Sequence, residues 1–443
     1  MRGNRTKYII CIFLLLVALI FSTGIKDLIP SGRGTELKIG VFADSYWGVH
    51  NGYEHRIPDD AIKLFEKDHP DIRVSYETGI LKEDYTEWLA EQIMKGEAPD
   101  VFFVMPEDFD LLIKMQALED ITDYVDKDKD FNKEVFYRSA YRFGSFGDAQ
   151  YLLPFECAPE LMFANGTILK ERDMDLPSLN WTWDDFYDIC KRVNDPAPGL
   201  TLKDKRTEIF GTVNYTWKEA FAANGNRLFS PDGRECNFSD TRITTALTFL
   251  DELNSLNEGN KENARYFEKG NVAFQPMYYS SYRNYVKNPL RESLYEDFEL
   301  TFLTMPAGYD GDNTSILDTL CIGMYSKSRH KKEAWEFMKM FTTDEMIQSE
   351  IFRYSEGLSP CRDITERELK KELEDSTYGT GNINMDVVRH AMDTAVPKYS
   401  FYGQDEAESA VEYAVNEILS GEGNIRMEQV IQDRKIKGIL SGE

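Results

Sequence analysis

The opening of the folded body constrains the architecture most, because strand-like and helix-like patterns alternate there. Leu37 to Phe42 alternates in hydrophobicity like a strand, Asp59 to Asp68 has helical periodicity, and Ile72 to Tyr76 is a second strand-like run. This order predicts a β-α-β unit with parallel strands and a right-handed crossover. A helix-like segment, Asp84 to Lys95, then leads into the apolar strand Val101 to Val104. We therefore expect an open α/β lobe.

The length of the chain requires more than one such lobe. It has 443 residues, of which 42% are hydrophobic, whereas a typical domain takes roughly 150 residues. Tyr151 to Phe155 is strand-like but contains Pro154, which suits an edge strand or a crossover between lobes. Phe298 to Met305 is expected to be the return crossing. We predict two open α/β domains joined by a hinge of about three crossings, with a cleft between them.

The remaining elements are assigned to the two lobes by their order. Lobe 1 is expected to comprise residues 36–153 and 306–355, and lobe 2 residues 154–305 and 356–443. Lobe 1 gains a strand at Ile316 to Tyr325 and a helix at Lys331 to Phe341. The helices expected in lobe 2 are Thr182 to Val193, Trp217 to Ala223, Thr241 to Asn254 and Ala407 to Leu419.

The N-terminus has the pattern of an export signal. Basic residues precede an apolar run from Tyr8 to Phe21, and no convincing small-residue cleavage site follows it. Residues 1–25 are therefore expected to be a signal peptide or an uncleaved membrane anchor, and residues 26–35, rich in glycine and serine, a tether. Cys11 lacks the small preceding residue that lipid attachment requires. The body is expected outside the cytoplasm at the cell surface, tethered or released after cleavage.

Charge and cysteine usage exclude several classes of function. The net charge of −26 argues against nucleic acid or an anionic membrane surface as the main partner. The cysteines show no C-x-x-C spacing, and the five histidines show no metal-ligand spacing. We expect isolated cysteines that serve as small core side chains, no metal, no cofactor and a monomeric body.

A tyrosine-rich segment from Phe267 to Tyr285 has the features of a pocket edge. Gly270 is expected to end a helix, Val272 to Phe274 to form a buried strand, and Pro276 to stop that strand. Four tyrosines follow, at positions 278, 279, 282 and 285. Their rings and hydroxyl groups suit a neutral polyhydroxylated ligand, but tyrosines at helical spacing equally pack a helix onto a sheet.

A series of short motifs occurs in a fixed order over nearly the whole chain. These are Phe65-Glu-Lys-Asp-His-Pro-Asp-Ile-Arg-Val74, Lys95-Gly-Glu-Ala-Pro-Asp-Val101, Gln116-Ala-Leu-Glu-Asp-Ile-Thr122, Leu161-Met-Phe-Ala-Asn165, Asn180-Trp-Thr-Trp-Asp-Asp-Phe186, Ala246-Leu-Thr-Phe-Leu250, Phe267 to Ala273, Ala334-Trp-Glu-Phe337 and Gly357-Leu-Ser-Pro360. In this order they resemble the extracellular solute-binding proteins of sugar ABC transporters, the maltose-binding-protein-like group. The resemblance implies the two-lobed periplasmic-binding-protein fold.

The sequence departs from that family at three loops of the cleft. Phe163-Ala-Asn-Gly166 replaces the usual Tyr-Asn-Lys, Asn224-Gly225 replaces a glycine pair, and Asp318-Thr-Leu320 replaces a glycine-rich strand entry. These changes affect ligand placement rather than the fold.

The resemblance and the predicted strand ends together place a ligand site between the lobes. The predicted ligand-binding residues are Asp44, Tyr46, Trp47, Glu107, Glu156, Trp217, Tyr279, Tyr282 and Asp318, with Asp108 beside Glu107. Tyr279 and Tyr282 are preferred because they lie one helical turn apart, whereas Tyr278 and Tyr285 are assigned to packing. The alternative interpretation is that the loop tryptophans plug a lobe surface and that the loop carboxylates are solvated groups.

The resemblance implies capture of a carbohydrate, an oligosaccharide, by hinge closure, and its delivery to the permease subunits of an ABC transporter. No nucleophile is evident, so we expect no enzyme activity. Two alternatives remain open at this point. One is a membrane-anchored sugar sensor or scaffold, and the other is an extracellular carbohydrate-active enzyme that uses two carboxylates, for instance Glu156 and Asp318.

Overall fold

The computed structural model describes residues 34–48, 52–194, 209–230, 233–256, 265–287, 298–374, 384–398, 401, 403–421 and 423–441. The predicted signal segment 1–25, nearly all of the tether and Cys11 lie outside these residues. Within them, no helix combines the length and the apolar character that crossing a membrane would need.

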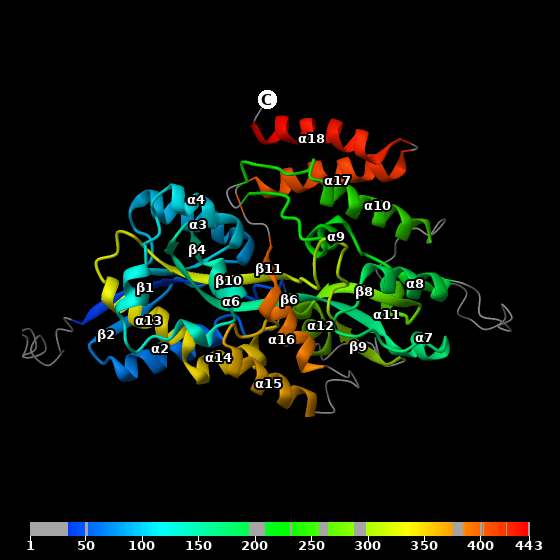
Figure 1. Ribbon diagram of the computed structural model, residues 1–443. Coiled ribbons are helices and arrows are strands. Elements are labelled where there is room, and N and C mark those ends of the chain that lie inside the picture. Colours follow the sequence, from blue (N-terminus) through cyan, green and yellow to red (C-terminus); the bar gives the residue numbers. More distant parts are fainter. Residues whose placement is uncertain are drawn as a thin grey trace, which may run out of the picture.

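A long mixed sheet runs through both halves of the molecule (Figure 1). Its main path consists of β2 (Ile72–Ser75), β1 (Thr35–Gly40), β3 (Val101–Val104), β10 (Ile316–Met324), β6 (Leu152–Asn165), β8 (Val272–Tyr278) and β7 (Phe210–Thr212). In addition, β11 (Val396–Pro397) pairs with β10, and β9 (Leu300–Leu303) pairs with β6. The strands β1, β2 and β3 are parallel, whereas β10 is antiparallel to both β3 and β6.

The first half forms the predicted β-α-β arrangement. Helix α2 (Arg56–Asp68) connects β1 to β2, and α3 (Lys82–Lys95) connects β2 to β3. Their apolar faces enter a first core, where Phe65 and Leu89 are almost fully buried. Shorter elements complete this half: α4 (Phe109–Lys114), α5 (Thr122–Lys127), α6 (Arg138–Phe143), β4 (Ser145–Phe146), β5 (Ala149–Gln150), α13 (Lys331–Thr343) and α14 (Glu345–Tyr354).

Strand β6 is the crossover between the two halves. All its residues are buried, and its side chains enter both cores, with Phe155 in the first and Met162 in the second. Both interpretations of its first part, as an edge strand and as a crossover, agree with the described strands, because Leu152 to Pro154 pair with β10 alone, and β6 then continues into the second half, where β8 and β9 pair with it. The register between β6 and β10 shifts next to Pro154, between Leu320 and Cys321. Such a bulge leaves one residue without a ladder hydrogen bond, so the strand can accommodate a proline, which has no N–H group.

The second half has a core of its own with many aromatic side chains, although Phe267, Tyr279 and Tyr282 of this half belong to the first core. It comprises α7 (Gly166–Glu171), α8 (Trp183–Asn194), α9 (Trp217–Ala223), α10 (Thr241–Ser255), α11 (Arg265–Glu268) and α12 (Tyr279–Lys287). Helices α17 (Gln404–Ser420) and α18 (Ile425–Ser441) lie above α10 at the top of Figure 1. The expected start of α8 is confirmed, since Asp185 accepts hydrogen bonds from the Thr182 amide and hydroxyl, each at 2.9 Å.

Two helices within residues 356–443 pack against elements of the first half. Helices α15 (Arg362–Glu374) and α16 (Met385–Thr394), which the proposed division assigns to lobe 2, place apolar residues in the first core. They pack against α14 and α6, where their amphipathic faces cover apolar surface. The expectation that Pro276 stops β8 is wrong, because the strand continues to Tyr278. Strand β7 pairs with β8 only as far as Phe274, so the missing N–H group of Pro276 removes no hydrogen bond between these two strands.

The five cysteines in the described residues are free and buried, as the sequence predicted. They occupy core positions as small side chains.

Candidate functional site

The loop after β1 brings a tyrosine of the first half onto an aspartate of β10. The Tyr46 hydroxyl donates a 2.7 Å hydrogen bond to Asp318 Oδ1, and both residues are almost fully buried. Burial and the Asp318 carboxylate hold the pKa of Tyr46 well above its usual value. The phenol therefore stays protonated and acts as a donor.

Two lysines from distant parts of the chain lie at this contact. Lys82 Nζ lies 4.4 Å from the centre of the Tyr46 ring and donates to the Tyr46 carbonyl. Lys398, just after β11, lies 3.4 Å from Asp318 Oδ2. Burial lowers the pKa of Lys82, whereas for Lys398 the effect of burial is outweighed by Asp318, so its pKa is raised. The exposed Glu107 carboxylate acts on Tyr46 and on both lysines.

Glu156 lies behind this cluster, on β6. It is 3% exposed and accepts a 2.5 Å hydrogen bond from Ser355 Oγ. Burial raises its pKa to about 7, although Ser355 and Trp47 oppose that shift. The Trp47 indole N–H lies beside the carboxylate without a hydrogen bond of standard geometry, and the Trp47 side chain is half-buried. Trp47 and Glu156 therefore meet, as the predicted site required.

The segment after α14 holds these residues in place. The Glu356 carboxylate accepts a hydrogen bond from Ser45 Oγ. Arg283 of α12 donates to the carbonyl of Gly357 and, at 2.8 Å each, to the carbonyl of Phe352 and to Glu372. A side chain at position 357 would collide with the site, because an added Cβ would lie 2.7 Å from Trp47 Nε1.

A second set of polar groups lies on the lobe 2 side of β6. Glu160 is opposite Tyr278 in the β6–β8 ladder, and its carboxyl group interacts with that of Glu219 at the start of α9. Burial, and then Glu219, raises the pKa of Glu160 well above its usual value, and burial raises that of Glu219. The electrostatic influence of Glu160 and Asp318 extends to Tyr278, which is half-buried.

Three predicted site residues do not face this region. Tyr279 and Tyr282 are 1% and 6% exposed, and they pack against each other and against Phe302 in the first core. Trp217 is 2% exposed, and its indole donates a 2.6 Å hydrogen bond to Glu412 of α17. Tyr279 and Tyr282, which the sequence analysis preferred, thus pack in the core, whereas Tyr278 lies opposite Glu160. The side chain of Tyr285 lies outside the described part of the structure.

The sequence interpretation also missed several residues of the site. These are Ser45, Lys82, Glu160, Glu219, Ser355, Glu356 and Lys398. Glu160 carried a usable signal, because it is a charged residue inside an otherwise apolar strand, where burial is costly. The two lysines carried none, since lysines are usually exposed.

The partly open space beside Asp44, Tyr46 and Glu156 is small. Its volume is about 50 Å³, which accommodates one or two water molecules. Outside it, Glu107 is exposed and Trp47, Tyr278 and Lys398 are half-buried, so these four side chains remain accessible to a larger ligand. Among the described residues, no group of histidine, cysteine, aspartate and glutamate side chains has the arrangement of a metal site.

Comparison with known proteins gives a consistent result. Residues 52–348 match the family model of bacterial extracellular solute-binding proteins. An uncharacterized lipoprotein from the oleD 5′ region of Streptomyces antibioticus is 23% identical over 284 residues, which span 61% of this chain and 60% of that protein.

Solved structures with the same fold cover the chain almost completely. The cyclic α-maltosyl-1,6-maltose binding protein of Arthrobacter globiformis matches with a TM-score of 0.71 and 13% identity over 93% of this chain and all of the other. The sugar-binding protein MalE of Xanthomonas citri has a TM-score of 0.71 and 15% identity, with 92% and 98% coverage. The substrate-binding protein Lmo0181 of Listeria monocytogenes, solved with cycloalternan, has a TM-score of 0.64 and 19% identity, with 92% and 100% coverage.

Proposed function

The chain belongs to the family of bacterial extracellular solute-binding proteins, and on that premise we propose that it captures an oligosaccharide between its lobes. The closed form would then deliver this ligand to the permease subunits of an ABC transporter. The proposed lobes are residues 36–153 with 306–355 and residues 154–305 with 356–443, except that α15 and α16 pack on the first.

One observation carries the carbohydrate assignment. Hydroxyl, carboxylate and ammonium groups converge at Tyr46, Asp318 and Lys398, next to the rings of Trp47 and Tyr278. Alternating polar groups and aromatic faces suit a sugar, which has hydroxyl groups at its edge and C–H groups on its faces. The names of the similar structures, which mention cycloalternan and cyclic maltosyl-maltose, support the same class of ligand.

The proposed contact residues follow from their positions. They are Asp44, Tyr46, Trp47, Glu107, Glu156 and Asp318 from the sequence, together with Tyr278, Glu160 and Lys398. We propose that the protein acts as a monomer at the cell surface, tethered to the membrane by its N-terminal segment.

A thermal-shift and calorimetry screen tests this proposal. Linear and cyclic α-glucans are the test ligands, with peptides and polyamines as the comparison set. A glucan present at 100 times its dissociation constant should stabilise the protein by about 2.7 kcal/mol. Stabilisation by peptides or polyamines alone would contradict the proposal.

The same samples test for catalysis. We propose binding without turnover, because Glu156 and Asp318 are both buried and engaged by Ser355 and Tyr46. Chromatography of the glucans after long incubation should recover them intact. Hydrolysis that disappears in Glu156→Gln would instead establish the carbohydrate-active enzyme, and signalling to a kinase without transport would establish the sensor.

A further inference from the structure

Helix α18 exposes four apolar residues and buries three polar ones. Its buried residues are Gln429, Gln432, Asp433 and Ile436, and the partly buried Ile425 and Leu440 pack against the second core. Its exposed apolar residues are Met427, Val430, Ile431 and Ile439, which are 36% to 68% exposed. Four of the thirteen large apolar side chains exposed in the described part of the chain thus lie on this one helix. A surface helix normally has the reverse arrangement, so the protein core does not account for the apolar outer face.

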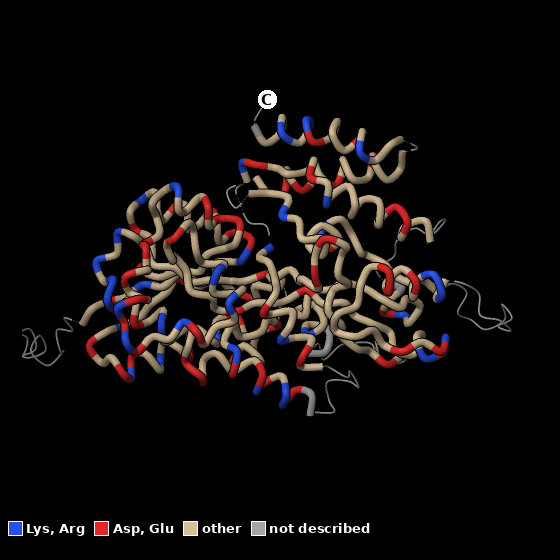
Figure 2. The backbone as a smooth tube through the Cα atoms, viewed as in Figure 1, with Lys and Arg blue, Asp and Glu red and all other residues tan. Residues whose placement is uncertain are grey.

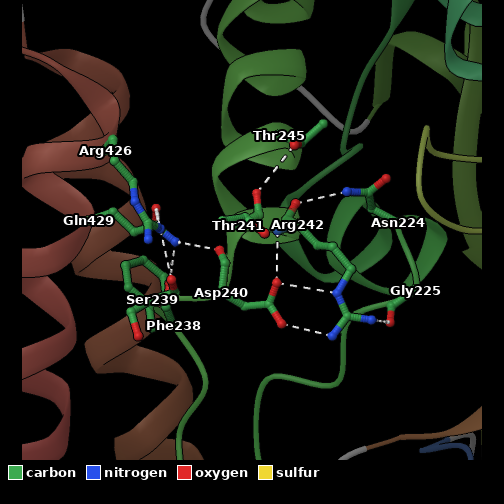
Figure 3. Close-up of polar contacts among 10 residues, drawn as sticks. All are labelled: Asn224, Gly225, Phe238, Ser239, Asp240, Thr241, Arg242, Thr245, Arg426 and Gln429. Carbon is green, nitrogen blue, oxygen red and sulfur yellow. Dashed lines mark hydrogen bonds and ion pairs between the residues drawn. The ribbon is translucent and has the colours of Figure 1, made fainter.

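The buried polar side chains fix the orientation of α18. Gln429 donates to the Asp240 carbonyl at 3.0 Å, and Arg426 donates to the Ser239 carbonyl at 2.8 Å (Figure 3). Asp433 accepts from the Ser239 amide at 3.1 Å. The segment before α10 is therefore bound to the inner side of α18 at three points, and the outer face keeps a defined direction.

The outer face is also cationic, in a protein that is strongly acidic overall. Helix α18 contains four basic residues and two acidic ones, whereas the whole chain contains 51 basic and 77 acidic residues (Figure 2). Asp433 is buried and pairs with Lys437 at 2.8 Å, so its charge is neutralised. Arg434 and Lys435 are exposed between Ile431 and Ile439. The helix thus presents apolar and basic side chains to solvent together.

We propose that the outer face of α18 rests on an anionic lipid surface. The face is formed by Met427, Val430, Ile431, Arg434, Lys435 and Ile439. Apolar side chains that enter the headgroup region and basic ones that pair with anionic headgroups are the two elements of such binding. The total charge of −26 does not prevent it, because charges farther than about 8 Å from the contact are screened at physiological salt.

The geometry favours lipid over a second copy of the chain. Helix α18 is the outermost element on its side of the molecule (Figure 1). A helix of 17 residues is about 25 Å long and about 10 Å wide, so its face covers about 250 Å². A stable protein interface needs about 800 Å² from each partner. A membrane has no such minimum, since the N-terminal segment is expected to hold the protein near it.

A polarity-sensitive dye on α18 tests the proposal in the full chain. The dye is attached to Ile431→Cys, with Cys11→Ala as background, since the other cysteines are buried. The control label is on Met94→Cys, which is 76% exposed on α3. The apolar N-terminal segment is expected to bind any bilayer, so the readout is the environment of the dye and not the bound fraction.

The label at position 431 should enter an apolar environment on vesicles that contain phosphatidylglycerol, and not on pure phosphatidylcholine. The signal should be lost in 1 M salt, where the screening length is about 3 Å. The double variant Arg434→Glu with Lys435→Glu should reduce the equilibrium constant for entry of the label into the apolar environment by at least about 25-fold, at about fivefold per cation. Its thermal unfolding should be unchanged.

Three results would overturn the proposal. The first is an equal dye response at position 94. The second is a response of the label at position 431 on pure phosphatidylcholine in high salt that equals its response on vesicles with phosphatidylglycerol. The third is a response without vesicles that grows with protein concentration, which would indicate contact between two copies of the chain.

Discussion

At the scale of single residues, the tyrosines after Phe274 show how one position decides between core and site. Strand β8 ends at Tyr278 and α12 begins at Tyr279, so these neighbours point to different surroundings. Tyr279 and Tyr282 enter the first core, whereas Tyr278 faces Glu160 across the β6–β8 ladder. The sequence predicted that tyrosines of this segment contribute to the site, and which of them meets the polar groups of β6 depends on where the strand ends.

Replacement of Tyr278 by phenylalanine should weaken ligand binding without loss of stability. The change removes one hydroxyl group of a half-buried side chain and keeps the ring, so a loss of about 1 kcal/mol, or about fivefold in affinity, is expected. Isothermal titration calorimetry with the best glucan measures it. Tyr282→Phe is the matched control, because Tyr282 lies in the core. A larger loss of affinity in Tyr282→Phe than in Tyr278→Phe would contradict the placement of the site.

Glu156 should make stability depend on pH in a defined direction. Its pKa is about 7 in the folded protein and 4.5 in an ordinary setting. Below pH 4.5 the Glu156 carboxyl group is protonated in both the folded and the unfolded protein, so it does not reduce the free energy of unfolding. Between pH 4.5 and 7 only the unfolded chain ionises, so stability falls as pH rises, and above pH 7 the loss levels off at about 3 kcal/mol or less.

The variant Glu156→Gln cannot ionise, so it should gain stability over the native protein at pH 8 but not at pH 4.5. Urea unfolding of both proteins at the two pH values, without ligand, measures this difference. The exposed Glu87→Gln is the control and should show no pH-dependent gain. An equal effect of Glu156→Gln at both pH values would show that the buried carboxyl group does not titrate in this range.

At the scale of elements, the predicted segments agree with the structure where a local pattern determines them. The predicted α9, Trp217 to Ala223, and β3, Val101 to Val104, have the observed bounds. The end of β8 was misplaced because Pro276 normally stops a strand, and only the short reach of β7 permits it here. Lys82 contacts Tyr46, after β1, and Lys398 contacts Asp318 of β10. These contacts join distant segments, so no local pattern predicts them.

A substitution in the segment after α14 is expected to displace side chains of the candidate site. In Gly357→Ala the added methyl group would lie 2.7 Å from Trp47 Nε1 and 2.9 Å from Glu156 Oε2. These groups must move, so we expect a loss of about 1–3 kcal/mol in the free energy of unfolding and weaker ligand binding. Denaturant unfolding and calorimetry measure the two effects.

The control for this variant is Gly438→Ala on α18, where an added methyl group meets no atom within 4 Å. Because alanine favours a helix over glycine, this control should gain about 0.5–1 kcal/mol. If Gly357→Ala behaves like Gly438→Ala, the close packing of Trp47 and Glu156 over position 357 is not present in solution.

At the scale of the whole molecule, the two cores and the strands between them agree with the predicted two-lobed fold. The order of the elements predicted β6 as a crossover, and β6 connects the cores as one continuous strand. The return crossing was misplaced at Phe298 to Met305, because β9 pairs with the second-half end of β6 and the chain returns along β10. The packing of α15 and α16 was not predictable, because an amphipathic helix shows that it packs but not against which element. The candidate site is proposed at this junction, where residues from many segments meet.

This arrangement predicts that ligand binding compacts the molecule. Tyr46 lies in a loop of the first half, whereas Glu160 lies on β6 and Tyr278 on β8, so a ligand that contacts all three would hold the two halves together. The radius of gyration in small-angle X-ray scattering should fall toward about 22 Å, the value for a compact chain of this length.

Two variants serve as controls. The radius of gyration of Tyr278→Phe at saturating ligand should fall as much as that of the native protein, because this change lowers only the affinity. The radius of Asp318→Ala at the same ligand concentration should not fall, since this change removes the carboxylate that joins Tyr46 to Lys398. If the radius is unchanged while calorimetry shows saturation, then the ligand binds to one lobe, and the polar groups on the two sides of β6 do not form one site.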